Sequence, residues 1–381
     1  MNKRILYVGF YALPDKDAAA NRVMNNANAL RDYGDNIVFI DEQDTDQYTN
    51  IDDSYHIVSN YDVWTYKRPK SIRGFVSKMT SINHIVQIIK KYKRIDVVIA
   101  YNYPSIALLK LKSYCRKHSI ILVSDCTEWY SGKEYRFPKN MLSSVDSFLR
   151  MRIIQKQIDG VICISTFLSK YYSKQRNIII PPLVDANQNI WKQDSLEYSK
   201  EVANIVYAGN PGKSKENIVA VFEAIDKMQR KDILFRIVGI SKSDMIKIAP
   251  NIESVLERIN CCVEFMGRKS HTETVQIISS SDYMIFMREK NRVSDAGFST
   301  KFVESITCGT PVITTDTGDL KRIIDKNKCG IIVQKYEELP RVLENICERK
   351  QNTLEKELFY TQIFDYRDYM NKLGAWIDDF V

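Results

Sequence analysis

Residues 297–313 combine a glycine turn, a helix start, a lysine and an acid at spacings that suit phosphate binding. We expect a loop, a short helix and a buried strand here, because the leading glycine permits a tight turn and Ser299 or Thr300 can cap the helix. The unpaired N–H groups and the dipole of such a helix start attract anions. Lys301 in the first turn opposes that dipole, which indicates an anionic ligand nearby. Glu304, one turn later, can accept hydrogen bonds from hydroxyl groups of the same ligand. The stretch therefore predicts a site for a sugar nucleotide.

Glycines and lysines also follow predicted strands elsewhere in the second half of the chain. Gly209 and Gly239 each end a predicted strand, and a glycine there lets a ligand approach the backbone. Lys213 and Lys215 follow in the loop after Gly209, where they would neutralise a diphosphate. Solvated loop lysines are the alternative, which we prefer for Lys213. A P-loop is excluded, because Tyr207 stands where its first glycine is required.

In the first half of the chain, polar residues follow two predicted strands, 3–9 and 120–123. Ligands of parallel α/β sheets bind beyond the carboxyl ends of the strands. Aromatic rings stack on sugar faces and carboxylates accept hydroxyl protons, so we expect an acceptor sugar to bind here. Loop residues that satisfy backbone groups are the alternative. The candidate acceptor contacts are Asn21, Arg22, Asp125, Glu128 and Trp129.

The elements that position these residues alternate between strand and helix, as in doubly wound parallel sheets. Apolar runs predict the strands, and apolar spacing of three to four residues predicts the helices. The expected strands are 3–9, 36–41, 97–100, 120–123, 160–165, 204–209, 234–239, 263–268 and 330–333, and another starts at 311–313. The expected helices are 17–33, 105–117, 137–157, 166–172, 272–280, 336–350 and 364–381, whereas 44–60 is expected to be irregular.

Length and a restart of the alternation near residue 204 indicate two domains. We expect an N-terminal domain at 1–185, a linker at 186–202, a second domain at 203–360 and a final helix at 361–381.

The composition of the 381 residues, 44% of them hydrophobic, is typical of a soluble globular protein, and no apolar run is long enough to span a membrane. The apolar start resembles a signal peptide, but residues 14–17 are Pro-Asp-Lys-Asp and no clear cleavage site follows, so a first strand explains it better. The eight cysteines show no metal-ligand spacing, which indicates reduced thiols in a cytoplasm. The four histidines are scattered, and we expect no metal site.

The net charge of +8 is unevenly distributed, because residues 67–118 contain 13 Lys or Arg and one acid, Asp96. One interpretation is a face that rests on anionic lipid, at the inner face of a membrane. Solvated amphipathic helices are at least as good an explanation. Nucleic-acid binding is a third, but no recognition module is present, so we expect none. The helical stretch 137–157 mixes apolar and basic residues and either touches a lipid-linked acceptor or packs internally.

Residues 296–313 resemble the donor-binding motif of family-4 glycosyltransferases, in which two acids stand eight positions apart around Gly-Phe-Gly and Ala-x-Gly-x-Pro-Val follows. Glu304 is the second acid, Cys-Gly-Thr-Pro-Val-Ile matches the tail, and Ala296 occupies the position of the first acid. Residues 299–304 also fit the Pro-Thr-Lys-Phe-Val-Glu variant of many polysaccharide-assembly members.

The resemblance extends to other parts of the chain. In the loop after the first strand of the second domain, Asn210 occupies the arginine position of the family and Lys215 its lysine, and we expect Arg288 to supply the charge lost at Asn210. In the first domain, Asp-x-x-Glu-Trp-Tyr at 125–130 and the Ile-Ser to Pro-Pro block before residue 183 are similar to family stretches.

The resemblance implies a GT-B fold, with two Rossmann-like domains facing across a cleft and a C-terminal helix that crosses back to the first domain. It implies a retaining, metal-independent transfer from a UDP- or GDP-sugar to a glycan or lipid-linked acceptor in surface polysaccharide synthesis. We expect no other cofactor. The implied donor-binding residues are Gly209, Lys213, Lys215, Gly239, Arg268, Arg288, Gly297, Phe298, Ser299, Thr300, Lys301 and Glu304. Catalytic roles are expected for Lys215, Glu304 and Asp125.

Two alternatives remain open. A sugar-nucleotide epimerase of the same architecture would need more acids and histidines at the cleft than the sequence offers. A non-catalytic partner or glycan-binding subunit is favoured by Ala296 and Asn210 and disfavoured by Lys215, Lys301 and Glu304. The acid triplets at 15–17 and 44–46 match metal-binding acid pairs of another glycosyltransferase class, but neither follows a strand in the required context.

Overall fold

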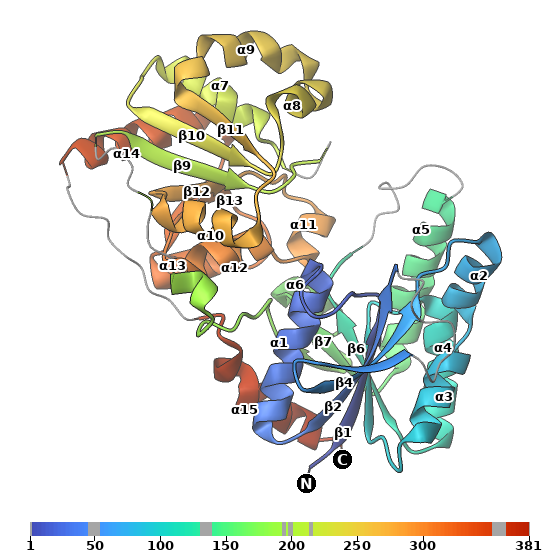
Figure 1. The fold of residues 1–381 in the computed structure, drawn as a ribbon. Coiled ribbons are helices and arrows are strands. Elements are labelled where there is room, and N and C mark those ends of the chain that lie inside the picture. The colour runs from blue at the N-terminus through green and yellow to red at the C-terminus, as the bar shows by residue number, and fades with distance from the viewer. Residues whose placement is uncertain are drawn as a thin grey trace. The chain divides into compact units, whose positions relative to one another are not determined.

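The computed structural model describes residues 2–44, 54–129, 139–192, 196, 201–212, 216–352 and 363–380 (Figure 1). The chain forms two compact units. The first unit comprises Met1–Asp185, Ala296–Phe298 and Asp365–Val381, and the second comprises Ala186–Asp295 and Ser299–Phe364. Each unit therefore combines segments that are distant in the sequence, so neither unit is one continuous range of residues.

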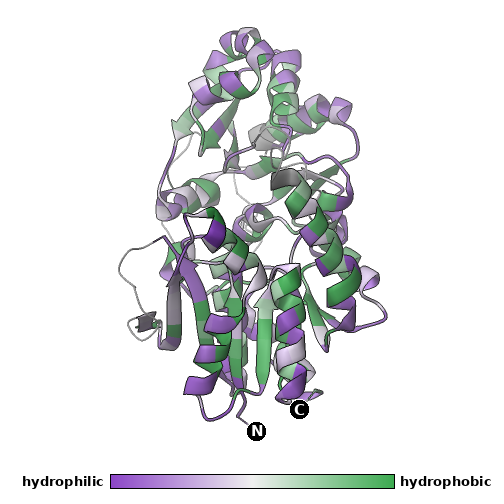
Figure 2. Cartoon of the chain, turned by 90° about the vertical axis from the view of Figure 1, so that its right-hand side faces the viewer, coloured by the Kyte–Doolittle hydropathy of each residue, from purple (hydrophilic) through white to green (hydrophobic). Residues whose placement is uncertain are grey.

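The first unit is built on an eight-stranded sheet with the order β3-β4-β2-β1-β5-β6-β7-β8. All neighbouring strands are parallel except β3 and β4. The inner strands are nearly continuous apolar runs, as expected of a sheet covered on both faces, and Figure 2 shows these hydrophobic residues along the strands. The strands are β1 (Arg4–Gly9), β2 (Asn36–Gln43), β3 (Tyr55–Val58), β4 (Tyr61–Lys67), β5 (Val97–Tyr101), β6 (Ile121–Cys126), β7 (Gly160–Cys163) and β8 (Arg176–Ile179).

Helices cover both faces of this sheet. On one face α1 and α15 bury apolar residues against β1 and β2, and on the other α3 and α4 do so. The helix after residue 139 continues through a π-helical turn, Arg150–Ile154. The helices are α1 (Ala18–Tyr33), α2 (Ile72–Thr80), α3 (Asn83–Lys91), α4 (Ser105–Lys117), α5 (Lys139–Leu149), α6 (Thr166–Tyr171) and α15 (Tyr366–Asp378).

Helix α15 packs along α1, although more than 330 residues separate them in the sequence (Figure 1). The Tyr33 hydroxyl donates to Asp378 at 2.6 Å, and the Tyr366 hydroxyl donates to Asp32 at 2.9 Å. Gly374 faces the ring of Tyr33 so closely that a Cβ atom there would lie 2.1 Å from it. The expected return of the C-terminal helix to the first unit is therefore confirmed.

The second unit is a six-stranded parallel sheet with the order β11-β10-β9-β12-β13-β14. Its strands are β9 (Ala203–Ala208), β10 (Ile233–Val238), β11 (Val263–Gly267), β12 (Tyr283–Phe286), β13 (Val312–Thr315) and β14 (Gly330–Val333). Its helices are α7 (Val219–Met228), α8 (Lys242–Ile248), α9 (Glu253–Arg258), α10 (His271–Ser280), α11 (Arg292–Ala296), α12 (Thr300–Thr307), α13 (Leu320–Asn327) and α14 (Leu339–Asn352).

The expectation that residues 44–60 are irregular is wrong in part, because Tyr55–Val58 forms strand β3. Tyr55–Val58 pairs antiparallel with β4 at the edge of the sheet. It is short and only half-buried, so its sequence carries little of the apolar signal that reveals an inner strand.

Candidate functional site

The carboxyl ends of β9 and β10 lie side by side in the second unit and end in glycines. Gly209 and Gly239 have φ of 130° and 108°, a conformation that residues with a side chain rarely adopt. A Cβ atom on Gly239 would lie 2.6 Å from the carbonyl oxygen of Gly209. The two strand ends therefore pack backbone against backbone, which only glycine permits.

Helix α12 begins at this edge of the sheet, and the loop, short helix and strand expected for 297–313 are all present. Ser299 caps the helix, accepting a hydrogen bond from the N–H of Phe302 at 3.4 Å. Thr300 is exposed, and Lys301 and Glu304 are partly buried. The additional helix α11 directly before this stretch was not expected.

The side chain of Lys301 runs across the end of β9. A Cβ atom on Gly209 would lie 2.5 Å from Cε of Lys301, so the glycine makes room for the lysine. The Lys301 ammonium group donates to Glu216 Oε2 at 2.5 Å and to the Tyr207 hydroxyl at 3.3 Å. It therefore ends in a polar cluster inside the second unit, at the carboxyl edge of the sheet.

Glu216 is the centre of this cluster, and its side chain is fully buried. Arg288 donates Nε at 3.0 Å and Nη2 at 2.8 Å to Oε1, and the Tyr207 hydroxyl donates to Oε2 at 2.5 Å. Burial acts to raise the pKa of Glu216, but Lys301 and Arg288 hold that pKa below its ordinary value. Burial and Glu216 raise the pKa of Tyr207 well above its ordinary value, so its hydroxyl remains a neutral donor.

These four residues, Tyr207, Glu216, Arg288 and Lys301, form what we name the Glu216 cluster, with one anion and two cations and hence a net charge of +1. Lys301 and Arg288 were expected at the site, and the structure brings them together. Glu216 and Tyr207 were missed. The partners Arg288 and Lys301 lie 72 and 85 residues from Glu216 in the sequence, and no local pattern marks the contact. The only signal was an acid at the end of the loop after β9.

A second pair joins α12 to the start of α10. Glu304 Oε1 is 3.5 Å from His271 Nε2, and both side chains remain partly exposed. The ring of Trp191 stands edge-on to His271 at 6.1 Å. A carboxylate and an imidazole at this distance can both contact hydroxyl groups of one ligand.

The other donor-side candidates differ in position. Arg268 is exposed, directly after β11. Lys213 and Lys215 lie outside the described residues. Gly297 and Phe298 group with the first unit, where Phe298 packs against the apolar cluster around Leu168.

Ala296, which occupies the position of the first acid of the family motif, is fully buried in the same apolar cluster of the first unit. Its carbonyl oxygen accepts a hydrogen bond from the hydroxyl of Ser165 at 2.7 Å. An acid at this position would lie among apolar groups, where a charge is costly.

Asp125 lies inside strand β6 rather than in the loop after it, because the strand runs on to Cys126 and not only to residue 123. Its carboxylate is fully buried and accepts hydrogen bonds from Arg22 Nη2 at 2.7 Å, Arg22 Nε at 3.0 Å and the Tyr7 hydroxyl at 2.5 Å. Arg22 also donates to the carbonyl oxygen of Ile180 at 2.9 Å. The two polar residues expected to reach an acceptor thus bind each other inside the first unit.

The remaining acceptor-side candidates lie nearer the surface. Asn21 and Glu128 are exposed. Trp129 is partly buried and stands edge-on to the rings of Tyr171 at 5.0 Å and Phe167 at 6.2 Å. Of the five candidates, these three are accessible to a ligand.

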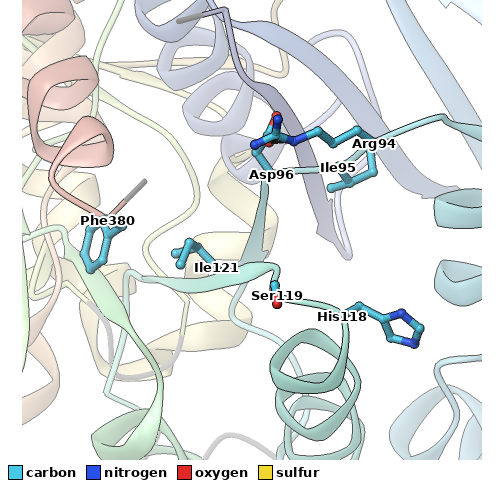
Figure 3. Close-up of a pocket in the computed structure, with 7 residues that line it drawn as sticks. All are labelled: Arg94, Ile95, Asp96, His118, Ser119, Ile121 and Phe380. Carbon is cyan, nitrogen blue, oxygen red and sulfur yellow. Dashed lines mark ion pairs between the residues drawn. The ribbon is translucent and has the colours of Figure 1, made fainter.

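A pocket of about 300 Å³ lies elsewhere, at the amino ends of β5 and β6, and is lined by Arg94, Asp96, His118 and Phe380 among others (Figure 3). Arg94 and Asp96 form an ion pair within it. Parallel sheets bind ligands at the opposite, carboxyl ends of their strands, so this pocket is not the candidate site.

Among the described residues, no three His, Cys, Asp or Glu side chains are placed to hold a metal ion together. No helix of the described chain is both long enough and apolar enough to cross a membrane.

Comparisons with known proteins agree with this architecture. Residues 203–349, from the start of β9 into α14, match the family described as Glycosyl transferases group 1. A search of curated proteins gives no significant match.

Solved structures similar to the whole chain show that the fold is GT-B. Sucrose-phosphate synthase from Thermosynechococcus elongatus has a TM-score of 0.72 at 14% identity, over 99% of each chain. HepE from Anabaena in complex with UDP-glucose has a TM-score of 0.64 at 14% identity, over 99% of each chain. The lipopolysaccharide outer core galactosyltransferase WaaB has a TM-score of 0.65 at 13% identity, over 99% of this chain and 100% of that chain.

Proposed function

We propose that this chain is a glycosyltransferase that moves a sugar from a nucleoside diphosphate sugar to a glycan or lipid-linked acceptor. The observation that carries the proposal is the meeting of Lys301 and Arg288 at the carboxyl edge of the second sheet, beside Gly209. The match of residues 203–349 to Glycosyl transferases group 1 and the GT-B fold support it.

In the proposed reaction, the bond between the anomeric carbon and the diphosphate breaks, and negative charge develops on the diphosphate. Lys301, Arg288 and the N-terminus of α12 stabilise that charge, since they are fixed in place before the reaction. Both cations are held by Glu216 in this structure, so a bound diphosphate takes over part of their hydrogen bonding. Lys215, by the resemblance, adds a third cation.

Glu304 is proposed to accept hydrogen bonds from hydroxyl groups of the ribose or of the donor sugar, and His271 lies within reach of the same groups. In the first unit, Asn21, Glu128 and Trp129 are the proposed acceptor contacts. The buried ion pair of Arg22 and Asp125 joins α1 to β6 and so holds the two elements that carry or precede these contacts.

The finer features of the proposal rest on the resemblance to family 4. These are retention of anomeric configuration, catalysis without a metal, a UDP- or GDP-sugar donor, and a cytoplasmic role in surface polysaccharide synthesis. The two cations of the Glu216 cluster supply the charge that a metal provides in other transferases.

A non-catalytic sugar-nucleotide or glycan-binding subunit is the second candidate. Two observations favour it: Glu216 already neutralises one of the two cations, and Ala296 stands buried where the family has an acid. Turnover of the donor distinguishes the two candidates.

The test measures thermal unfolding with UDP, GDP and their sugar conjugates, together with slow hydrolysis of the same donors. We expect one nucleotide class to raise the melting temperature, because a ligand of the folded state alone stabilises it. Lys301→Met and Glu304→Gln should each reduce that rise, whereas Lys321→Met, a lysine on α13 of the same unit with a side chain 47% exposed, should not.

Stabilisation without hydrolysis or transfer would favour the binding subunit. No stabilisation by any nucleotide, or an equal loss in Lys321→Met, would contradict a donor site at the Glu216 cluster.

A further inference from the structure

Three helices of the first unit, α2, α4 and α5, present large apolar side chains to solvent. None of the nine residues of α2 is buried. Monomeric proteins rarely expose contiguous apolar surface on this scale unless it binds something. The side chains that are 41–85% exposed are Ile72, Phe75 and Val76 on α2, Ile106 and Leu109 on α4, Met141, Leu142, Val145 and Phe148 on α5, and Ile153 in the following π-helical turn.

These side chains form one surface rather than scattered points. Helix α4 lies between the other two, since it contacts both α2 and α5, and all three lie at the same side of the unit in Figure 1. Figure 2 faces this side, where hydrophobic and hydrophilic segments alternate along the helices. On α5, residues 141, 145 and 148 follow helical spacing and therefore share one face. We name this surface the α2-α4-α5 face.

The same helices are strongly basic. The segments 72–80, 105–117 and 139–154 contain nine Lys or Arg and one acid, Asp146. Among the cations, Arg73, Lys110 and Arg152 are exposed. The carboxylate of Asp146 accepts a hydrogen bond from the N–H of Ser105, at the start of α4, at 2.7 Å.

The structure separates this surface from helix α3, which lies in the same basic stretch 67–118 for which a lipid contact was one interpretation. Ile85, Ile88 and Ile89 of α3 are buried in the core against β1 and β5, and its exposed residues are all polar: Asn83, Gln87, Lys90 and Lys91. The α3 segment is thus a solvated amphipathic helix, whereas α2, α4 and α5 keep apolar side chains exposed among cations.

We infer that the α2-α4-α5 face docks on the surface of an anionic phospholipid bilayer. Exposed Phe, Leu and Ile side chains enter the boundary between headgroups and acyl chains, and the surrounding Lys and Arg side chains bind lipid phosphates. The charge decides between partners. Arg150 is buried and Lys78 pairs with the buried Glu42, but Arg73, Lys110 and Arg152 are exposed, so the surface is complementary to anionic headgroups. Its many separate apolar side chains suit a fluid surface. This inference does not depend on the proposed transferase activity.

The experiment is flotation of the full chain with vesicles of phosphatidylcholine, with and without phosphatidylglycerol. We expect binding only to the phosphatidylglycerol vesicles, weakening as salt is added because salt screens the charges. Arg73→Gln/Lys110→Gln should weaken partitioning by about 25-fold, at roughly fivefold for each cation near the surface. The matched control is Lys247→Gln/Lys321→Gln, which removes the same charge from exposed positions of the second unit.

A second pair of variants tests the apolar part. Leu142 is 56% exposed on the face, and Ile57 is 65% exposed on β3, away from it. We expect Leu142→Ser to weaken partitioning by about tenfold, since burying a leucine side chain is favourable, and Ile57→Ser to leave it unchanged. Thermal unfolding of each variant should match the parent, because the altered side chains are exposed.

Binding that does not require phosphatidylglycerol, or equal losses in the face variants and their controls, would overturn the inference. A second outcome would also overturn the inference: the chain does not bind vesicles, and light scattering shows a dimer that becomes a monomer when Leu142 is replaced. That result would assign the face to contact between two copies of the chain. Because the assay contains no sugar nucleotide, its failure is distinct from failure of the proposed activity.

Discussion

Glu216→Gln separates the two roles that we assign to the Glu216 cluster. The substitution removes the negative charge that holds Lys301 at 2.5 Å and Arg288 at 2.8 Å, and it keeps the shape of the side chain. Breaking a buried ion pair typically costs about 3–5 kcal/mol. Lys301 and Arg288 keep 15% and 14% of their side chains exposed and retain some water, so we expect the lower end, about 3 kcal/mol less stability for the second unit.

The same change should favour the ligand. Without Glu216 the site holds two cations and no anion, and a diphosphate no longer meets a fixed negative charge. At a separation of about 6 Å and an effective dielectric constant of about 40, between that of a protein site and that of water, the repulsion is about 1.4 kcal/mol. We therefore expect roughly tenfold tighter binding of the nucleoside diphosphate, although the free protein is less stable.

The assay combines urea unfolding without ligand and calorimetric titration with UDP and GDP. Glu42→Gln is the matched control, because Glu42 is also fully buried at its side chain and pairs with two cations, Arg68 and Lys78, in the first unit. It should lose stability without a change in nucleotide affinity. If Glu216→Gln is destabilised while its nucleotide affinity stays equal to the parent's, Lys301 and Arg288 do not contact the diphosphate and our assignment of the site is wrong.

Three further predictions concern the glycine that Lys301 crosses, a buried histidine and metals. Gly209→Ala places a Cβ atom 2.5 Å from Lys301 Cε and should abolish nucleotide stabilisation in a thermal shift, whereas Gly267→Ala, also at positive φ but with nothing within 4 Å, should only lower the melting temperature. Burial lowers the pKa of His84 to about 4, so the folded state holds this side chain neutral. The stability that depends on the neutral form is complete above pH 6.5, and about 3 kcal/mol of it is lost as pH falls towards 4. His84→Gln should reduce the dependence of the free energy of unfolding on pH across this range, and an unchanged dependence would contradict the burial effect. Donor hydrolysis should continue in EDTA, and a loss that Mg²⁺ or Mn²⁺ restores would contradict transfer without metal.

The elements that sequence predicts best are those whose signals are local. Helix α1 is an example, since Asp17 accepts a hydrogen bond from the N–H of Ala20 at 2.7 Å and Gly34 ends the helix at φ 118°. Helix α12 and its Ser299 cap are another. Each boundary depends on residues within one or two turns, so the pattern carries the information.

Sequence reasoning could propose donor-side residues one at a time, but it could not identify their partners. Lys301 and Arg288 stand out by type and position, whereas their shared contact with Glu216 forms only when β9, β12 and α12 are packed together. Asp125 shows the reverse problem. Its loop-like sequence neighbours suggested access to a ligand. Strand β6 continues for three residues beyond the expected end at 123, which places Asp125 in the interior, where Arg22 from α1 binds it.

The position of α15 has a consequence for synthesis of the chain. Tyr366, Leu373 and Ile377 complete the core that β1, β2 and α1 begin, so this face of the first unit lacks one of its two covering helices until these late residues have left the ribosome. Residues 203–349 contain every strand of the second sheet and become available earlier. The half of the protein that is translated first is therefore the half that finishes folding last, and in the meantime the apolar flank of α1 is open to chaperones.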